Sequence, residues 1–194
     1  TATVNDCFKP VSRYFDRITR PEQIMPALRR AMAVLTDPAE CGPVTLSLCQ
    51  DVQAEAYDYP ESFFDEKIWN VRRLMPDGDE FATAAAALLQ AKKPVIIAGG
   101  GVLYSQASKA LRTFAERYGV PVLETQAGKS SLPHDHPLNM GSVGVTGTSA
   151  SNTLAEEADV VLAVGTRLQD FTTGSWALFK NDDLKIIGLN VQPF

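Results

Sequence analysis

The feature that most constrains the fold is an apolar run followed at once by three glycines, within residues 94–101. The run holds one valine and two isoleucines in succession, which predicts a short strand buried on both faces, as in parallel sheets covered by helices. Gly99, Gly100 and Gly101 then allow the backbone to turn sharply and to approach its neighbours closely.

A helix is predicted after the glycines, because apolar residues recur at helical spacing between Ala107 and Tyr118. We expect Ser105 to be its N-cap. A strand, a glycine turn and a helix form the first half of a nucleotide-binding-type unit. The third glycine of the dinucleotide fingerprint is missing, so the turn either binds phosphate at a helix N-terminus or is only a tight connection.

Strands and helices alternate through the C-terminal part of the chain. Apolar runs predict three further strands, at 120–123, 159–165 and 185–189. Helices are predicted after Asp79, with an apolar face, and over about 148–157, with a threonine N-cap. The glycine-rich stretch between the second strand and the latter helix is predicted to be a long loop. This alternation predicts an α/β fold, a Rossmann-like parallel sheet with flanking helices.

The N-terminal part predicts a helix and a strand of a second α/β domain. Thr19 and Glu22 suggest a capping box, and Pro26 predicts a kink or a late helix start. A strand is predicted at 44–49. Residues 58–78 carry scattered aromatic side chains without periodicity, which indicates a linker that lies against a surface.

Composition excludes some classes of function. The formal net charge is −5, and no cluster of Lys and Arg is visible, so we expect no nucleic-acid partner. No apolar run is long enough to span a membrane. The three cysteines, Cys7, Cys41 and Cys49, lack metal or redox spacing and are expected to be reduced, which favours a cytoplasmic protein.

No convincing catalytic set is visible. The only histidines, His134 and His136, lie between prolines in one loop and are interpreted as turn residues rather than metal ligands. No serine has the setting of a nucleophile. Arg167 follows a buried strand, where it could bind phosphate or pair with Asp170; we keep both interpretations.

Several motifs, in order, resemble the thiamine-diphosphate-dependent enzyme family, which includes acetohydroxyacid synthase and pyruvate oxidase. They are the Gly-Pro-Val strand at 42–48 with Asp51-Val52, the strand and glycines at 93–101, the loop motifs at 128–147, and the strand ending in Gly-Thr-Arg at 158–167. The resemblance implies that 1–57 is the C-terminal part of a pyrimidine-binding domain, 58–78 a linker and 79–194 the central Rossmann-like domain, whole or truncated.

The resemblance also implies that the chain is a fragment. No Gly-Asp-Gly metal motif occurs in the sequence, so thiamine diphosphate and Mg²⁺ are expected to bind outside this chain. No catalytic and no metal-binding residue can therefore be carried over. The full-length protein would act on a small-molecule substrate and form a homo-oligomer.

In flavin-containing members of the family the central domain holds FAD. The matching positions here are Gly99, Gly100, Gly101, Gly144, Gly147 and Arg167. Two departures argue against FAD. Val145-Thr146 stands where a histidine is usual, and Asn190 with its neighbours replaces an acidic pair.

Segments 17–23 and 44–53 look most like the branch of the family that hydrolyses a cyclic 1,2-dione in myo-inositol catabolism. The alternatives are another branch, such as an acetohydroxyacid synthase-like lyase or transferase, a nucleotide-binding module, and a purely structural spacer between cofactor domains.

Overall fold

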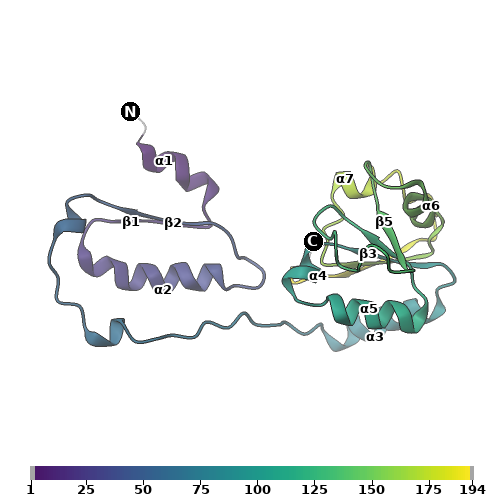
Figure 1. Cartoon of the computed structure of the whole chain (residues 1–194), viewed down its shortest axis with the longest axis horizontal. Helices are drawn as coiled ribbons and strands as arrows, with labels where there is room; N and C mark the ends of the chain where they lie inside the picture. Colours follow the sequence, from purple (N-terminus) through teal and green to yellow (C-terminus); the bar gives the residue numbers. More distant parts are fainter. Residues whose placement is uncertain (1–2, 193–194) are drawn as a thin grey trace. The chain divides into compact units, whose positions relative to one another are not determined.

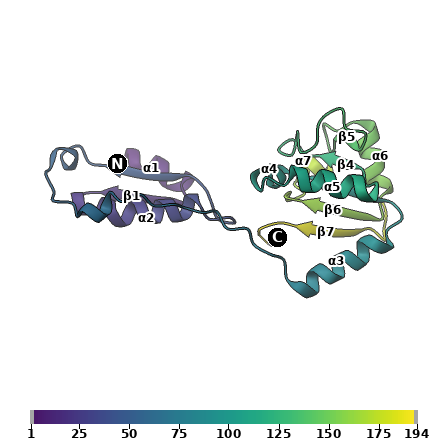
Figure 2. The ribbon, with the colours of Figure 1, turned by 60° about the horizontal axis from the view of Figure 1, so that its bottom comes forward.

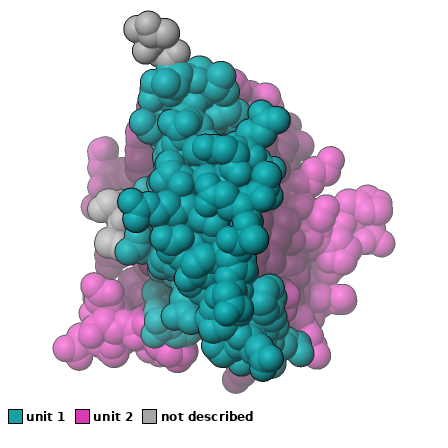
Figure 3. Space-filling model, turned by 90° about the vertical axis from the view of Figure 1, so that its left-hand side faces the viewer, with its two compact units in different colours: residues 1–74 teal, residues 75–194 magenta. Residues whose placement is uncertain are grey.

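A computed structural model describes residues 3–192 of the 194-residue chain. The chain divides into two compact units, Thr1–Leu74 and Met75–Phe194 (Figure 3). The boundary falls inside the predicted linker. Within the described residues no helix is long and apolar enough to cross a membrane.

The first unit is a β-α-β unit preceded by a short helix (Figure 1). Its elements are α1 Val4–Phe8, β1 Tyr14–Ile18, α2 Ile24–Leu35 and β2 Val44–Leu48. The two strands pair in parallel, with Tyr14 opposite Val44 and Ile18 opposite Leu48. The predicted tail of a second α/β domain is therefore confirmed, with β1 added to it.

Helix α2 starts late, as predicted, and Pro26 lies in its first turn. The predicted capping box of Thr19 and Glu22 is wrong. The side-chain oxygen of Gln23 accepts the backbone N–H of Thr19 at 2.8 Å and that of Arg20 at 3.2 Å. Gln23 does this because one 3-10 turn separates Arg20 from the start of α2.

The aromatic stretch after β2 packs on its own unit. The Tyr59 hydroxyl donates to the Pro21 carbonyl at 3.1 Å, and the Tyr59 ring stacks on Phe63 with ring centres 5.5 Å apart. Beyond the 3-10 turn Glu61–Phe63, residues 64–77 have no helix or strand. This agrees with a linker that lies against a surface over its first part only.

The second unit is a parallel sheet with helices on both faces (Figures 1 and 2). Its strands, in the order β5-β4-β3-β6-β7, are β3 Pro94–Ala98, β4 Val122–Glu124, β5 Asn139–Ser142, β6 Val160–Val164 and β7 Lys185–Leu189. Its helices are α3 Gly78–Gln90, α4 Gly100–Tyr104, α5 Ser108–Tyr118, α6 Ser149–Glu157 and α7 Asp170–Thr173. The predicted Rossmann-like fold class is confirmed.

Strand β3 lies in the middle of the sheet and contributes to two cores. Val95 and Ile97 pack with α6 and the segment after α7, whereas Ile96 and Ala98 pack with α4 and α5. The alternation follows from the period of two in a strand. Burial on both faces explains why the sequence of this strand is a continuous apolar run.

Two local predictions in this unit are wrong. Ser105 ends α4 instead of capping α5, because the helix already begins inside the glycine run. Asp77, not Asp79, caps α3, and its side chain accepts the N–H of Asp79 at 2.9 Å. The predicted apolar face of α3 is half-buried at Ala84, Ala85 and Leu88, whereas Phe81 is 63% exposed.

Asp159 fixes the connection between α3 and β3. Its carboxylate accepts the backbone N–H of Lys92 at 2.6 Å and that of Lys93 at 2.9 Å. Burial raises the pKa of this carboxyl, but these hydrogen bonds lower it more, so the pKa lies below its ordinary value of 3.8.

Candidate ligand site at the switch point of the sheet

The sheet has a topological switch point between β3 and β6. The chain passes from β3 outward to β4 and β5, then returns to the other side of β3 as β6 and β7. Ala98 pairs with Val164, so the two strands end side by side. In open α/β sheets ligands bind outside the carboxyl ends of strands at this kind of point. The topology therefore places the candidate site where these two strands end.

The predicted glycine turn and the segment of Arg167 do meet there. The Gly99 N–H donates to the Val164 carbonyl at 2.8 Å, and the Gly101 N–H donates to the Gly165 carbonyl at 3.0 Å. A Cβ added at Gly101 would lie 2.5 Å from the Gly165 Cα, and one added at Gly99 would lie 2.3 Å from the Gly165 oxygen. Glycine is thus required at both positions, because the backbone of the glycine turn is in direct contact with the backbone at Gly165.

This geometry favours the tight-connection interpretation of the glycines over phosphate binding. The Gly101 N–H is already used within the chain. Helix α4 has only five residues, so its dipole is short. Gly100 is less crowded: an added Cβ would meet the Ala127 Cβ at 3.2 Å.

Arg167 is exposed just beyond β6. Among residues 3–192 no ion pair joins it to Asp170, so the predicted alternative of a salt bridge is not observed. Asn190, after β7, donates through its side-chain amide to the Thr166 carbonyl at 3.0 Å. The residue that replaces the usual acidic position thus holds the backbone beside Arg167.

Gly144 and Gly147 belong to a separate turn between β5 and α6. Gly144 has a φ of +103°, and an added Cβ would lie 2.1 Å from the Phe171 carbonyl oxygen. The Asn152 side chain clamps this turn, because it accepts the Gly144 N–H and donates to the Gly144 carbonyl, both at 3.0 Å. Sequence reasoning missed Asn152, which carries no motif signal beyond its place in a helix after a glycine-rich loop.

His136 is a structural residue, as the turn interpretation predicts. It is buried, its Nδ1 accepts the Leu138 N–H at 3.2 Å, and its Nε2 lies 3.0 Å from a Glu116 carboxylate oxygen. Since Nδ1 accepts, Nε2 carries the proton and donates to Glu116. The hydrogen bonds from Arg112 and then His136 hold the pKa of Glu116 below its ordinary value.

The other polar groups at this edge also support the backbone. Glu124, the acid that ends β4, is buried and accepts the Leu132 N–H at 3.1 Å. The Ser131 hydroxyl donates to the Gly128 carbonyl at 2.6 Å. Within residues 3–192 no group of three or more His, Cys, Asp or Glu side chains is placed to hold a metal ion.

The fold is that of an α/β nucleotide-binding-type domain. Comparison with known protein families identifies the family to which the chain belongs. Residues 81–194 match the family described as "Thiamine pyrophosphate enzyme, central domain". The match covers more than half of the chain, and the chain belongs to this family.

Several similar relatives share one name, 3D-(3,5/4)-trihydroxycyclohexane-1,2-dione hydrolase. The protein of that name from Clostridium perfringens is 53% identical over 192 residues. Those from Clostridium botulinum and Bacillus thuringiensis are 50% and 48% identical over the same length. Each alignment covers 99% of this chain and 30% of the relative, so the chain spans under a third of the proteins it matches.

Proposed function

We propose that this chain supplies the central domain, with the end of the preceding domain, of a thiamine-diphosphate-dependent enzyme. The enzyme would hydrolyse 3D-(3,5/4)-trihydroxycyclohexane-1,2-dione in myo-inositol catabolism. The observation that carries the proposal is the 53% identity to a hydrolase of that name over 99% of the chain. Because the identity spans both units, it supports this branch of the family over an acetohydroxyacid synthase-like enzyme.

The proposed role of the chain is structural. Bound thiamine diphosphate supplies a nucleophilic carbon for attack on the substrate carbonyl. The described residues do not fit a site for its Mg²⁺, since they contain no group of metal ligands. We therefore assign cofactor, metal and catalytic groups to parts of the enzyme outside this chain, and we expect the 194-residue chain alone to be inactive.

We further propose that the switch-point site does not hold FAD. The N–H groups of Gly99 and Gly101 already donate to the Val164 and Gly165 carbonyls, and Asn190 occupies the position where an acid is usual in the family. Arg167 is exposed and makes no ion pair within residues 3–192, which favours the alternative of a nucleotide-binding module. Calorimetry of the chain with FAD, NAD and ADP distinguishes a site that holds no nucleotide from a nucleotide-binding module. Binding tighter than about 10 μM would favour the module.

The full-length enzyme is proposed to be a cytoplasmic homo-oligomer without nucleic-acid or membrane partners. The acidic net charge of −5 supports the absence of a nucleic-acid partner.

A genetic replacement tests the proposed function. In a Clostridium perfringens strain that grows on myo-inositol, the matching 192 residues of its hydrolase are replaced by this chain. We expect growth on myo-inositol to be retained, and a matched control with the central domain of an acetohydroxyacid synthase should not grow. Loss of growth despite a normal level of the assembled chimera would contradict the proposal.

A further inference from the structure

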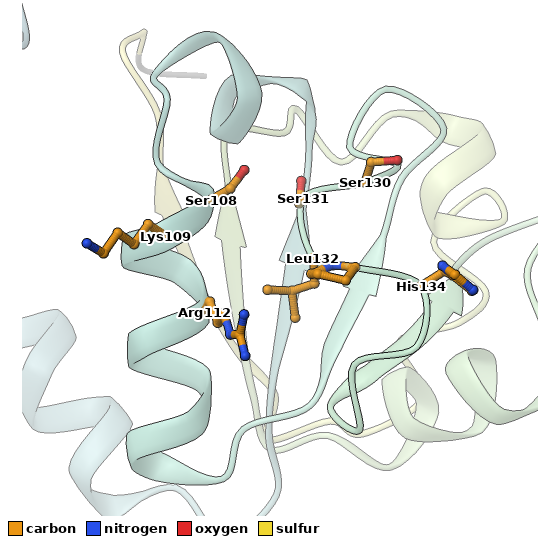
Figure 4. Close-up of a pocket in the computed structure, with 8 residues that line it drawn as sticks. Ser108, Lys109, Arg112, Ser130, Ser131, Leu132 and His134 are labelled. Carbon is orange, nitrogen blue, oxygen red and sulfur yellow. The ribbon is translucent and has the colours of Figure 1, made fainter.

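The second unit contains a cavity that the glycine site does not use. It has a volume of about 500 Å³ and lies between the first turns of α5 and the loop 130–134 that follows β4 (Figure 4). Small-molecule sites range from about 300 to 1,000 Å³. Neither Arg167 nor any of the glycines discussed above lines this cavity.

The lining of the cavity is cationic. It includes Lys109 and Arg112 and no carboxylate, although the whole chain carries a net charge of −5. Arg112 donates its Nε to Glu116 at 2.8 Å, which leaves the terminal N–H groups of its guanidinium fork without a partner among residues 3–192. A guanidinium fork matches the oxygens of a phosphate group.

The geometry of the side chains fits this charge. In Figure 4 the Arg112 side chain extends from α5 toward Leu132, and the Ser108 hydroxyl points toward Ser131. The Lys109 ammonium points away from the loop, but the side chain is exposed and makes no ion pair with any described residue. Arg112 is thus the cation aimed at the cavity, and Lys109 adds to its potential.

The N-terminal end of α5 borders the same cavity through Ser108 and Lys109. The helix has 11 residues, and its N-cap, Ala107, gives no side-chain cap, so N–H groups of the first turn lack an intrahelical acceptor. These groups and the helix dipole favour an anion. Leu132 and Pro133 form an apolar wall beside them, which suits an organic body attached to that anion.

We propose that this cavity binds a small organic phosphate monoester. The phosphate group meets the Arg112 guanidinium, and the organic body lies over Leu132 and Pro133. The site is separate from the switch point, and its binding is independent of the function proposed above.

Phenyl phosphate is the probe, with phenol and inorganic phosphate for comparison, and NMR amide shifts of the ¹⁵N-labelled chain are the readout. We expect saturable shifts at Ser108, Lys109 and Ser131 with a Kd below about 1 mM, and weaker binding of both comparison compounds. Shifts that do not saturate would overturn the proposal. Equal binding of phenol would overturn phosphate recognition, and equal binding of inorganic phosphate would overturn the organic monoester.

Variants locate the site. Arg112→Gln should weaken phenyl phosphate binding about tenfold or more, because a charge-assisted hydrogen bond is lost. Arg117→Gln removes the same charge from the same helix outside the cavity, and Arg167→Gln removes it from the switch point; both should bind as the unaltered chain does. Equal weakening by either control would overturn the proposal. Lys109→Glu, at an exposed position, gives a second test that leaves the Arg112 ion pair intact and should also weaken binding.

Discussion

Replacing Gly101 by alanine should strongly destabilise the second unit. The new Cβ would lie 2.5 Å from the Gly165 Cα and 3.0 Å from its carbonyl oxygen, closer than packed atoms allow. Gly165 cannot easily retreat, because its φ is +60° and its N–H donates to the Leu189 carbonyl at 2.9 Å. Relief of the clash would also stretch the hydrogen bond from the Gly101 N–H to the Gly165 carbonyl.

The two opposing effects can be compared. Alanine in a helix is favoured over glycine by roughly 0.5–1 kcal/mol. Overpacking a filled site costs about 1–3 kcal/mol, and a lost backbone hydrogen bond about 0.5–1.5 kcal/mol. The cost of the clash exceeds the gain in helix propensity, and we expect the free energy of unfolding to fall by about 2 kcal/mol.

Urea unfolding of the whole chain, followed by far-UV circular dichroism, measures this change. Gly78→Ala is the matched control, because Gly78 begins α3 and an added Cβ there meets nothing within 4 Å. That control should raise the free energy of unfolding by up to about 1 kcal/mol. If Gly101→Ala were as stable as the unaltered chain, backbone contact would not be the reason for the glycine, and the argument for a tight connection would fail.

Three further predictions follow from the described contacts. Asn152→Ala should destabilise the second unit by about 1–3 kcal/mol and speed hydrogen exchange of the Gly144 amide, because both polar contacts of the turn are lost; unchanged exchange would contradict the clamp. Asp159→Asn should destabilise the chain at neutral pH, and since its folded pKa lies below 3.8, the difference from the unaltered chain should shrink as the pH falls below that value; a difference that grows in acid would have the wrong sign. Excised 75–194 should unfold cooperatively in a thermal melt, whereas excised 1–74, with two strands and few buried apolar side chains, should give the poorly dispersed NMR spectrum of an unfolded chain.

The elements predicted from the sequence are those with a clear apolar run or stripe, whether buried, as in β3, or largely exposed, as in β7. Strands β3 and β6 are apolar throughout, and α5 has a clear apolar stripe, so their patterns had one interpretation. The predicted aromatic linker also has little regular structure.

The missed elements are held by neighbours rather than by their own pattern. Strand β1 has the sequence YFDRI and only one fully buried residue, so its register is set by pairing with β2. Strand β5, with the sequence NMGS, is an edge strand held by β4 and by the Ser151 hydroxyl, which donates to the Met140 carbonyl at 2.6 Å. Neither pairing partner can be identified from local sequence.

The candidate site was predicted in part. Gly99 and Arg167 each follow an apolar run, so both were predicted to lie at the ends of strands. The structure brings their segments together. The sequence could not show that the Gly99 and Gly101 N–H groups donate to the Val164 and Gly165 carbonyls, because these hydrogen bonds depend on contact between two segments more than 60 residues apart.

The most direct test of the account is the activity of a purified chimera. In it, this chain replaces the matching 192 residues of the Clostridium perfringens hydrolase, and hydrolysis of the cyclic dione is measured with and without added thiamine diphosphate. We predict a kcat/KM within about tenfold of the parent, or roughly 1.4 kcal/mol in transition-state stabilisation, that depends on thiamine diphosphate and not on FAD. A folded, fully assembled chimera that does not hydrolyse the dione would contradict the account.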